Sequence, residues 1–172
     1  MDLKAEFSKV CNKKDAIRVA EYVFHNPNCL KDLIELFTDN DKSYSHRAGW
    51  TLNTLNTIKD VDLSMHAEEL IELFLSDQVL NSNIRNLLHV FRNLRFDEDQ
   101  EGMVLDKCFR LLEDIQTEAA IKCLSVETIY RIAKHEPLLL RELKTIMSFQ
   151  LEYSSAAFGA TYRKYAKLID GR

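Results

Sequence analysis

The residues best suited to binding a metal or acting as nucleophiles are spread along the whole chain. The histidines are His25, His46, His66, His89 and His135, and the cysteines are Cys11, Cys29, Cys108 and Cys123. A structural zinc site normally draws on close ligand pairs such as Cys-x-x-Cys, and none of these residues forms such a pair. His66 and Glu69 are one helical turn apart, but two adjacent ligands do not complete a site. We therefore predict no metal centre, and we interpret the cysteines as small buried residues of a reducing compartment.

The residues of a catalytic site cannot be picked out either. The chain has no Gly-x-Ser-x-Gly elbow and no distinguishable Ser/His/Asp set. With four glycines in 172 residues, a glycine-rich loop that cradles phosphate groups is not expected. The sequence therefore predicts no cofactor and favours a binding function over an enzymatic one.

Cations near the C-terminus are the remaining candidates for chemistry. From Thr117 onward the chain has nine Lys or Arg residues against six Asp or Glu, although the net charge of the whole chain is −4. The candidate binding residues are Arg92, Tyr130, Arg131, Lys134, Arg163 and Lys167. We predict that they form a basic strip along the second helices of successive helix pairs. The alternative is an ordinary solvated face with pairs such as Glu127–Arg131, each worth roughly 0.2–0.5 kcal/mol.

The elements that would position this strip follow from an internal repeat. Residues 33–37 and residues 70–74 both read Leu-Ile-Glu-Leu-Phe, 37 positions apart. A cation recurs near the start of each following segment, as Arg47, Arg85 and Lys122. Such a period is typical of stacked helical hairpins, each of which buries its apolar face only against its neighbours. We expect the three recurring cations to be structural, bonding loop carbonyls or acids between repeats.

Composition and apolar spacing both favour helices. Four glycines and two prolines are few for the tight turns of a β-sheet, and apolar residues recur every three or four positions. The expected helices span about 2–11, 15 to a stop at 25–28, 29–38, 43–57, 64–76, 82–94, 98–113 and 117–135, then a helix begun by Pro137 and a last one from Ser154 or Ser155 to about 169. We predict one all-α domain, residues 1–172, folded as an α-α superhelix of about five antiparallel pairs.

Start signals can be assigned to several of these helices. Asp15, Ser64 and Thr117 are predicted N-caps, because their side-chain oxygens can accept hydrogen bonds from the first backbone N–H groups. Asp97, followed three residues later by Gln100, predicts a capping box.

The segment Arg47-Ala48-Gly49-Trp50-Thr51-Leu52, at the start of a second helix, resembles HEAT-like repeats, as do the paired helices and the period of 37–38 residues. The resemblance covers roughly residues 29–170. It looks most like the small bacterial HEAT-like proteins of unassigned function. It implies an armadillo-like α-solenoid whose second helices line a concave surface. Tetratricopeptide repeats fit less well because their period is about 34 residues.

Trp50, the only tryptophan, carries a more distant resemblance. HEAT-like DNA glycosylases, which excise alkylated purines, use tryptophans and an aspartate on the concave face, with the aspartate one turn after a tryptophan. Here Thr54 stands one turn after Trp50, so the catalytic carboxylate is missing. We expect Trp50 to be a bulky residue packed between repeats.

Two functions are compatible with these features. The first is a non-enzymatic scaffold that binds a protein or peptide on its concave face. The second is nucleic-acid binding of the glycosylase kind through the basic strip, which a net charge of −4 does not favour because phosphate neutralisation drives such binding. A basic inner surface with an exposed Trp50 would indicate nucleic acid, whereas a mixed surface would indicate a protein. No run of about 18 apolar residues occurs and no signal peptide is recognised, so we expect a cytoplasmic protein without a membrane partner.

Overall fold

The computed structural model of the protein describes residues 1–9, 12–39, 42–59, 61–153 and 155–171. All the regular secondary structure in these ranges is helical, so the predicted all-α fold is confirmed. The chain divides into two compact units, residues 1–96 (unit 1) and residues 97–172 (unit 2). The prediction of a single domain over residues 1–172 stays a prediction.

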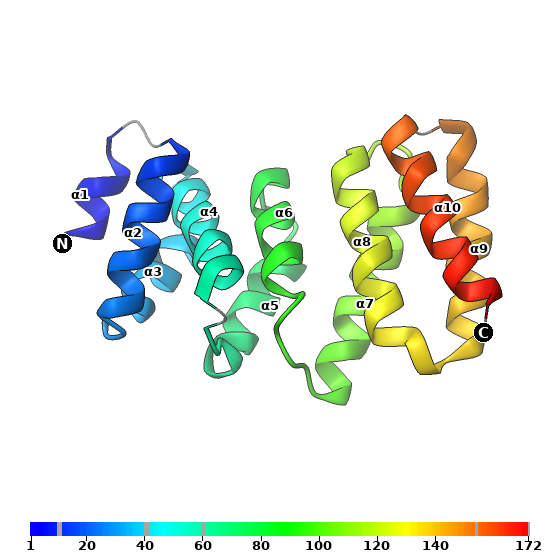
Figure 1. Ribbon diagram of the computed structural model, residues 1–172, viewed down its shortest axis with the longest axis horizontal. Helices are drawn as coiled ribbons and strands as arrows, with labels where there is room; N and C mark the ends of the chain where they lie inside the picture. Colours follow the sequence, from blue (N-terminus) through cyan, green and yellow to red (C-terminus); the bar gives the residue numbers. More distant parts are fainter. Residues whose placement is uncertain (10–11, 40–41, 60, 154, 172) are drawn as a thin grey trace. The chain divides into compact units, whose positions relative to one another are not determined.

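Unit 1 arranges its described helices in two layers (Figure 1). The helices are α1 (Leu3–Phe7), α2 (Lys13–His25), α3 (Cys29–Thr38), α4 (Lys42–Lys59), the 3-10 turn η1 (Ser64–His66), α5 (Ala67–Leu75) and α6 (Asn81–Val90). Helices α2, α4 and α6 pack side by side in one layer, and α1, α3 and α5 form the other. Helix α4 is central, since it contacts α1, α2, α3 and α6.

Unit 2 repeats the two-layer pattern. Its helices are α7 (Glu98–Glu113), α8 (Ala119–Ile132), the 3-10 turn η2 (Ala133–His135), α9 (Pro137–Gln150), the 3-10 turn η3 (Leu151–Tyr153) and α10 (Ala156–Asp170). Helix α7 packs on α8 and α9 packs on α10, so each consecutive pair is a helical hairpin. Helices α8 and α10 are neighbours in one layer, and α7 and α9 are neighbours in the other.

The sequence repeat is visible in the packing. In both Leu-Ile-Glu-Leu-Phe copies, residues 33–37 in α3 and 70–74 in α5, the first Leu, the Ile and the Phe are buried while the Glu is exposed. Hydrogen bonds also join residues about one period apart. The Asn83 amide donates to the Ser45 hydroxyl at 2.6 Å, 38 positions away, and the Gln150 amide donates to the Glu113 carbonyl at 2.7 Å, 37 positions away. Successive hairpins within each unit are therefore joined by polar contacts as well as by apolar burial.

All three recurring cations interact within the protein, and the hydrogen-bond partner is defined for two of them. The Arg47 guanidinium donates to the backbone carbonyl of Phe7, the last residue of α1, so it bonds a carbonyl at a helix end where a loop carbonyl or acid was predicted. The Lys122 ammonium is buried and donates to the side-chain oxygen of Gln150 at 2.6 Å. Its partner is therefore a side-chain amide, and not the loop carbonyl or acid that we expected. The third cation, Arg85, is exposed.

Some predicted helix starts are confirmed, and others are displaced for local reasons. The capping box of Asp97 and Gln100 is present, and Pro137 is the first residue of α9. Asp15 does not cap α2. Asn12 does so by accepting from the N–H groups of Lys14 and Asp15, and the Asp15 carboxylate accepts in return from the Asn12 N–H. The side chain of Asp15 therefore completes a capping box from inside the helix.

Two further predicted caps are wrong. The Ser64 hydroxyl donates to the Asp62 carboxylate at 2.6 Å, and a 3-10 turn comes before α5, which begins only at Ala67. The Thr117 hydroxyl donates to Asp114, and α8 begins at Ala119 after Glu118, whose side chain makes no capping bond. In both places a nearby aspartate competes for the hydroxyl that was expected to cap the helix. Ser155 is the residue before α10 and makes no side-chain capping bond either, while Cys11 and Ser154 lie outside the described residues.

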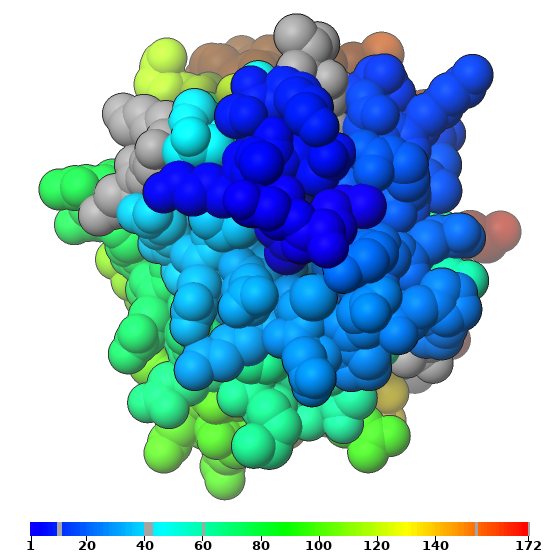
Figure 2. Space-filling model, turned by 90° about the vertical axis from the view of Figure 1, so that its left-hand side faces the viewer, coloured from blue at the N-terminus to red at the C-terminus, as the bar shows by residue number. Residues whose placement is uncertain are grey.

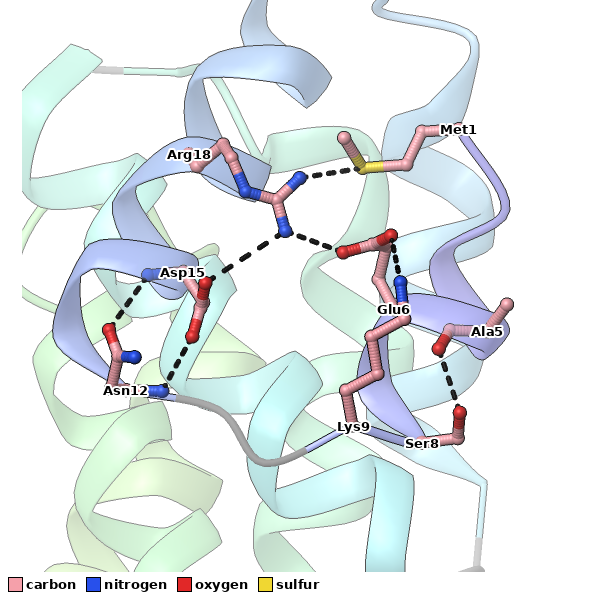
Figure 3. A network of polar contacts seen from close by, with 8 residues as sticks. All are labelled: Met1, Ala5, Glu6, Ser8, Lys9, Asn12, Asp15 and Arg18. Atoms are coloured by element: carbon pink, nitrogen blue, oxygen red, sulfur yellow. Dashed lines mark hydrogen bonds and ion pairs between the residues drawn. The ribbon is translucent and has the colours of Figure 1, made fainter.

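Helix α1, only five residues long, is joined to α2 by charged side chains. It lies at the surface of one end of unit 1, against α3 and α4 (Figure 2). The Glu6 carboxylate accepts from Lys9 at 2.8 Å and from Arg18 of α2 at 2.5 Å. Figure 3 shows the Arg18 guanidinium between Glu6 and Asp15, whose carboxylate is 4.0 Å away. The hydrogen bond from Lys9, followed by that from Arg18, lowers the pKa of Glu6 from 4.5 to about 2.

This lowered pKa predicts a contribution of Glu6 to stability that depends on pH. The pKa of Glu6 in the unfolded chain is 4.5, and above this pH the contribution is fully present. It is lost as the pH falls towards about 2, because the unfolded chain binds the proton more readily than the folded protein does. Urea unfolding followed by circular dichroism between pH 5 and 2 should show a smaller loss of stability for Glu6→Gln than for the wild type. Glu68→Gln, at an exposed acid of α5, is the control and should follow the wild type. Equal slopes for Glu6→Gln and the wild type would contradict the prediction.

Candidate functional site

A hollow of about 350 Å³, here termed the Trp50 pocket, is formed by neighbouring helices of unit 1. Helix α4 contributes His46, Trp50 and Asn53, and helix α6 contributes Ser82, Arg85, Asn86 and His89. Within each helix these residues recur at spacings of three or four, which places them on one face. Because α4 and α6 pack side by side, the two faces together form one site on the layer of second helices.

Trp50 forms one wall of the pocket. Its side chain is half-buried, so the indole lies between two successive repeats, as the sequence predicts, and still keeps part of its surface accessible. The Thr54 hydroxyl, one turn later, donates to the Trp50 backbone carbonyl at 2.8 Å. The position one turn after the tryptophan therefore carries a helix-bound hydroxyl where the glycosylases have their catalytic aspartate.

Asn86 is the most unusual residue of the pocket. It is only 8% exposed, and no hydrogen bond joins its side-chain amide to another residue of the described part of the chain. By contrast with Asn86, the buried Asn56, which is 3% exposed, donates from its amide to the Val90 carbonyl at 3.2 Å. The side-chain atoms of Asn86 are not among the fully buried polar atoms that lack a partner in the described part of the chain.

The lining of the pocket is rich in hydrogen-bond donors and carries positive charge. Arg85 supplies a full positive charge, and the indole of Trp50 and the amides of Asn53 and Asn86 supply N–H groups. None of the described lining residues is an Asp or Glu. The pocket thus combines an aromatic ring with hydrogen-bond donors, of which Arg85 also interacts within the protein.

The predicted basic strip is distributed over both units. Tyr130 and Arg131 lie on α8, and Arg163 and Lys167 lie on α10. Because α8 packs beside α10, these residues share one layer of unit 2, where the Tyr130 and Tyr165 rings are 5.1 Å apart between centroids. The sequence did not single out Tyr165 as part of this surface, although its spacing placed it on the apolar side of α10.

Two residues of the strip are not on a second helix. Arg92 belongs to unit 1 and follows α6, because the helix ends at Val90 and the Arg92 N–H bonds to the His89 carbonyl in a tighter turn. Lys134 lies in η2, the 3-10 turn that follows α8. The placement of both residues on second helices was therefore wrong. The sequence spacing of the charged residues continues past the last residues of α6 and α8, whereas the α-helical hydrogen bonds stop there.

The members of the strip also differ in exposure. Lys134, Arg163 and Lys167 are exposed, whereas Arg131 and Tyr130 are half-buried. Burial lowers the pKa of Arg131, and the charges of Glu101 on α7 and of Glu127 partly offset this effect. Arg92, which is exposed as well, Arg163 and the two lysines therefore present well-hydrated charges, and the role of the strip in binding stays a prediction.

The Trp50 pocket was missed by sequence reasoning, although a signal for it exists. His46, Trp50 and Asn53 are each followed 36 positions later by a polar residue that lines the same pocket, namely Ser82, Asn86 and His89. A polar pattern repeated at nearly the period of the apolar pattern indicates a shared surface on neighbouring repeats.

Two further features are absent from the described part of the chain. No three His, Cys, Asp or Glu residues lie together there in a way that would hold a metal ion. Among the described helices, none combines the length and the apolar character needed to cross a bilayer.

Comparison with known proteins agrees with the arrangement of the helices. A family model described as a HEAT repeat domain matches residues 3–169. No curated protein and no solved structure matches the chain. The family match spans nearly the whole sequence, and both units are built from the helical hairpins that such repeats contain. The chain therefore belongs to the HEAT repeat domain family.

Proposed function

We propose that the protein is a non-enzymatic scaffold that binds another protein, or a peptide segment of one, on its layer of second helices. The observation that supports this proposal best is the mixed lining of the Trp50 pocket, which combines an aromatic ring, amides, a hydroxyl and one arginine. Aromatic and arginine side chains in partly desolvated pockets are the usual anchors of protein–protein interfaces. A helical repeat scaffold supplies an extended surface for such anchors.

The charge of each unit weighs against nucleic acid as the main ligand. Residues 1–96 contain 14 Asp or Glu and 12 Lys or Arg, and residues 97–172 contain 13 and 11. Neither unit is net basic, whereas nucleic-acid binding gains most of its free energy from phosphate neutralisation. Nucleic-acid binding of the glycosylase kind remains the alternative. In unit 2, the basic strip residues Tyr130, Arg131, Lys134, Arg163 and Lys167 are proposed as a protein-binding surface of their own, and in unit 1 Arg92 is proposed as a further binding residue. We propose a cytoplasmic location.

Selection of short random peptides by phage display tests this function. Enriched peptides are expected to bind the wild type and to lose about tenfold or more in affinity, roughly 1.4 kcal/mol, with Arg163→Glu/Lys167→Glu on α10. The matched control is Arg110→Glu/Arg141→Glu, which makes the same change of charge at exposed residues of α7 and α9, in the other layer. Fluorescence anisotropy measures the peptide affinity of both double variants.

Three outcomes are informative. Equal losses in the two double variants would contradict placement on the second helices. A failure to enrich any peptide would count against the scaffold itself. Binding of duplex DNA at low salt, weakening steeply as salt is raised, would favour the alternative.

A further inference from the structure

We infer that a second hollow of unit 1, here termed the Asn83 pocket, receives the ammonium group of a lysine side chain of the partner. This inference rests on the proposed function and names one chemical group that the partner presents. The pocket would then select partners by a lysine at one defined place on a longer binding surface.

The Asn83 pocket has a volume of about 320 Å³ and lies between two successive hairpins of unit 1. Ser45 comes from the first turn of α4, Leu73 from the last turn of α5, and Asn83 from the first turn of α6. Val79 and Leu80, in the loop between α5 and α6, add to its apolar wall. The pocket therefore lies at the loop ends of α4 and α6, which belong to the layer of second helices.

The feature that points to a ligand is the side-chain oxygen of Asn83. The residue is 3% exposed, and its Nδ2 donates to the Ser45 hydroxyl at 2.6 Å. The Ser45 hydroxyl in turn donates to the Phe37 carbonyl at 2.6 Å. Because that carbonyl can only accept, it takes the single proton of the hydroxyl, and Ser45 must accept from the amide nitrogen of Asn83. The orientation of the amide is thereby fixed, and its Oδ1 is buried with no hydrogen-bond partner in the described part of the chain.

The two halves of the Asn83 amide therefore differ in what they do. The donor half joins α6 to α4 across two repeats. The buried acceptor half costs stability in the free protein, since no hydrogen bond within the described chain replaces its hydration. It gains a bond when a ligand brings an N–H group into the pocket. A ligand with a donor is therefore favoured over one that offers only acceptors or only apolar surface.

The walls of the pocket favour an ammonium over other donors. An ammonium has three N–H donors and no acceptor, and the methylene stem of a lysine packs along apolar surface. Leu73, Val79 and Leu80 are half-buried and offer such a surface in the same pocket as Asn83. A guanidinium presents a rigid fork that suits two adjacent acceptor atoms, whereas the amide of Asn83 offers one oxygen.

Charge complementarity points the same way. None of the described lining residues is a Lys, Arg or His, so no cation of the lining repels an incoming ammonium. Asp39 lines the pocket and already interacts within the protein, so it contributes negative potential and is not counted as an open acceptor. The exposed Asp77 lies in the chain between the lining residues Ser76 and Gln78 and adds a second negative charge.

The test uses the full chain and three blocked, fluorescently labelled peptides of equal length, in which Ser alternates with Lys, with norleucine or with Arg. The norleucine peptide keeps the apolar stem without the ammonium, and the Arg peptide keeps the charge with a different head group. By fluorescence anisotropy the Lys peptide is expected to bind about tenfold more tightly than the norleucine peptide, and more tightly than the Arg peptide. In NMR spectra of the ¹⁵N-labelled protein, the side-chain amide signals of Asn83 should shift with saturation.

A first pair of variants separates the open oxygen from the structural hydrogen bond. Asn83→Ala is expected to weaken binding of the Lys peptide about tenfold, and Ser45→Ala is its matched control. Both variants lose the hydrogen bond between the two side chains and should lower the midpoint of urea unfolding. Ser45→Ala keeps the Asn83 oxygen and should therefore leave the affinity for the Lys peptide unchanged.

A second pair does not disturb the core. Gln78→Lys places a cation at the pocket from an exposed loop position, so it should weaken the Lys peptide several-fold with an unchanged midpoint of unfolding. Gln116→Lys makes the same change of charge at an exposed position of unit 2 and should leave the affinity unchanged. This pair decides the matter if Asn83→Ala does not fold.

Several results would overturn the inference. These are equal binding of the Lys and norleucine peptides, tighter binding of the Arg peptide, no shift of the Asn83 amide signals at saturating Lys peptide, or equal effects of Gln78→Lys and Gln116→Lys. Equal losses of affinity in Asn83→Ala and Ser45→Ala would also overturn it, since the shared hydrogen bond and not the open oxygen would then matter. If display-selected peptides still bind the second-helix layer in any of these cases, the scaffold function stands and only the lysine specificity fails.

Discussion

Replacing Gly49 by alanine is expected to lower the free energy of unfolding by about 1–3 kcal/mol, the usual cost of overpacking a core. Gly49 is a buried residue of α4, and a Cβ atom added there would overlap the ring of Phe37 on α3, lying 2.8 Å from its Cδ2. Phe37 is fully buried and belongs to the repeated Leu-Ile-Glu-Leu-Phe segment, so its ring cannot turn into solvent. The missing side chain is what allows α3 and α4 to approach so closely.

Gly102→Ala provides the control for this prediction. Gly102 lies within α7, and apart from its chain neighbours and the backbone of its own helix, no described atom lies within 4 Å of the position that its Cβ would take. Alanine there removes the entropic cost of glycine in a helix and should stabilise the protein by roughly 0.5–1 kcal/mol. Urea unfolding should therefore move the midpoint in opposite directions for the two variants. A gain in stability for Gly49→Ala would show that the two helices can separate at no cost.

The fold could be read from the sequence because apolar burial sets it. The spacing of Leu33, Ile34 and Phe37 defines one face of a helix, and the copy 37 positions later repeats that face in α5. Such a pattern acts over a whole helix and does not depend on any single bond. Helix ends depend on individual hydrogen bonds, and there the sequence offered several donors and acceptors of similar quality. Asn12 and Asp15 are both good capping residues, and only the folded backbone shows that one caps the helix and the other reinforces the cap.

The candidate site was harder to predict than the fold, since polar residues give no burial signal of their own. His46, Trp50 and Asn86 lie on two different helices, and their proximity depends on the register in which α4 packs against α6. The cations of the strip were easier to identify in the sequence, but their charge alone did not indicate how deeply each side chain is buried. Arg131 and Lys134 belong to the same predicted strip, yet one is half-buried and the other is exposed. Exposure depends on the neighbouring helix, which a single-helix pattern does not contain.

Lys122 is the centre of a buried polar chain that joins three helices of unit 2. Its ammonium, 2% exposed, donates from α8 to the Gln150 side-chain oxygen at 2.6 Å, and the Gln150 amide donates to the Glu113 carbonyl at 2.7 Å. Gln150 is the last residue of α9 and Glu113 the last of α7. The chain of bonds therefore provides a partner for one of the terminal carbonyls of α7, which lack a partner within their own helix.

Breaking this chain at one link is expected to cost more than removing both partners. Gln150→Met should lower the free energy of unfolding by about 3–5 kcal/mol, because it leaves a buried ammonium without an acceptor. Lys122→Met should lower it by about 1–3 kcal/mol, because it leaves only a neutral oxygen without a donor. The double variant should be more stable than Gln150→Met alone, since no buried charge remains. Urea unfolding of the wild type, the two single variants and the double variant gives the double-mutant cycle. Additive losses of stability would show that the two side chains act independently.

The dependence of stability on pH gives a second and separate readout for Lys122. Burial lowers its pKa below 10.5, so between the lowered value and 10.5 the unfolded chain binds more protons and stability rises with pH. The buried Cys108 thiol acts in the opposite direction, because burial raises its pKa from 9.0 to about 12 and the folded state then holds the proton longer. In the wild type the two effects oppose each other, whereas in Lys122→Met only that of Cys108 remains. The stability of Lys122→Met relative to the wild type should therefore fall as the pH rises from 9 to 10.5. A constant difference over this range would mean that the Lys122 ammonium titrates as freely in the folded protein as in the unfolded chain, despite its burial.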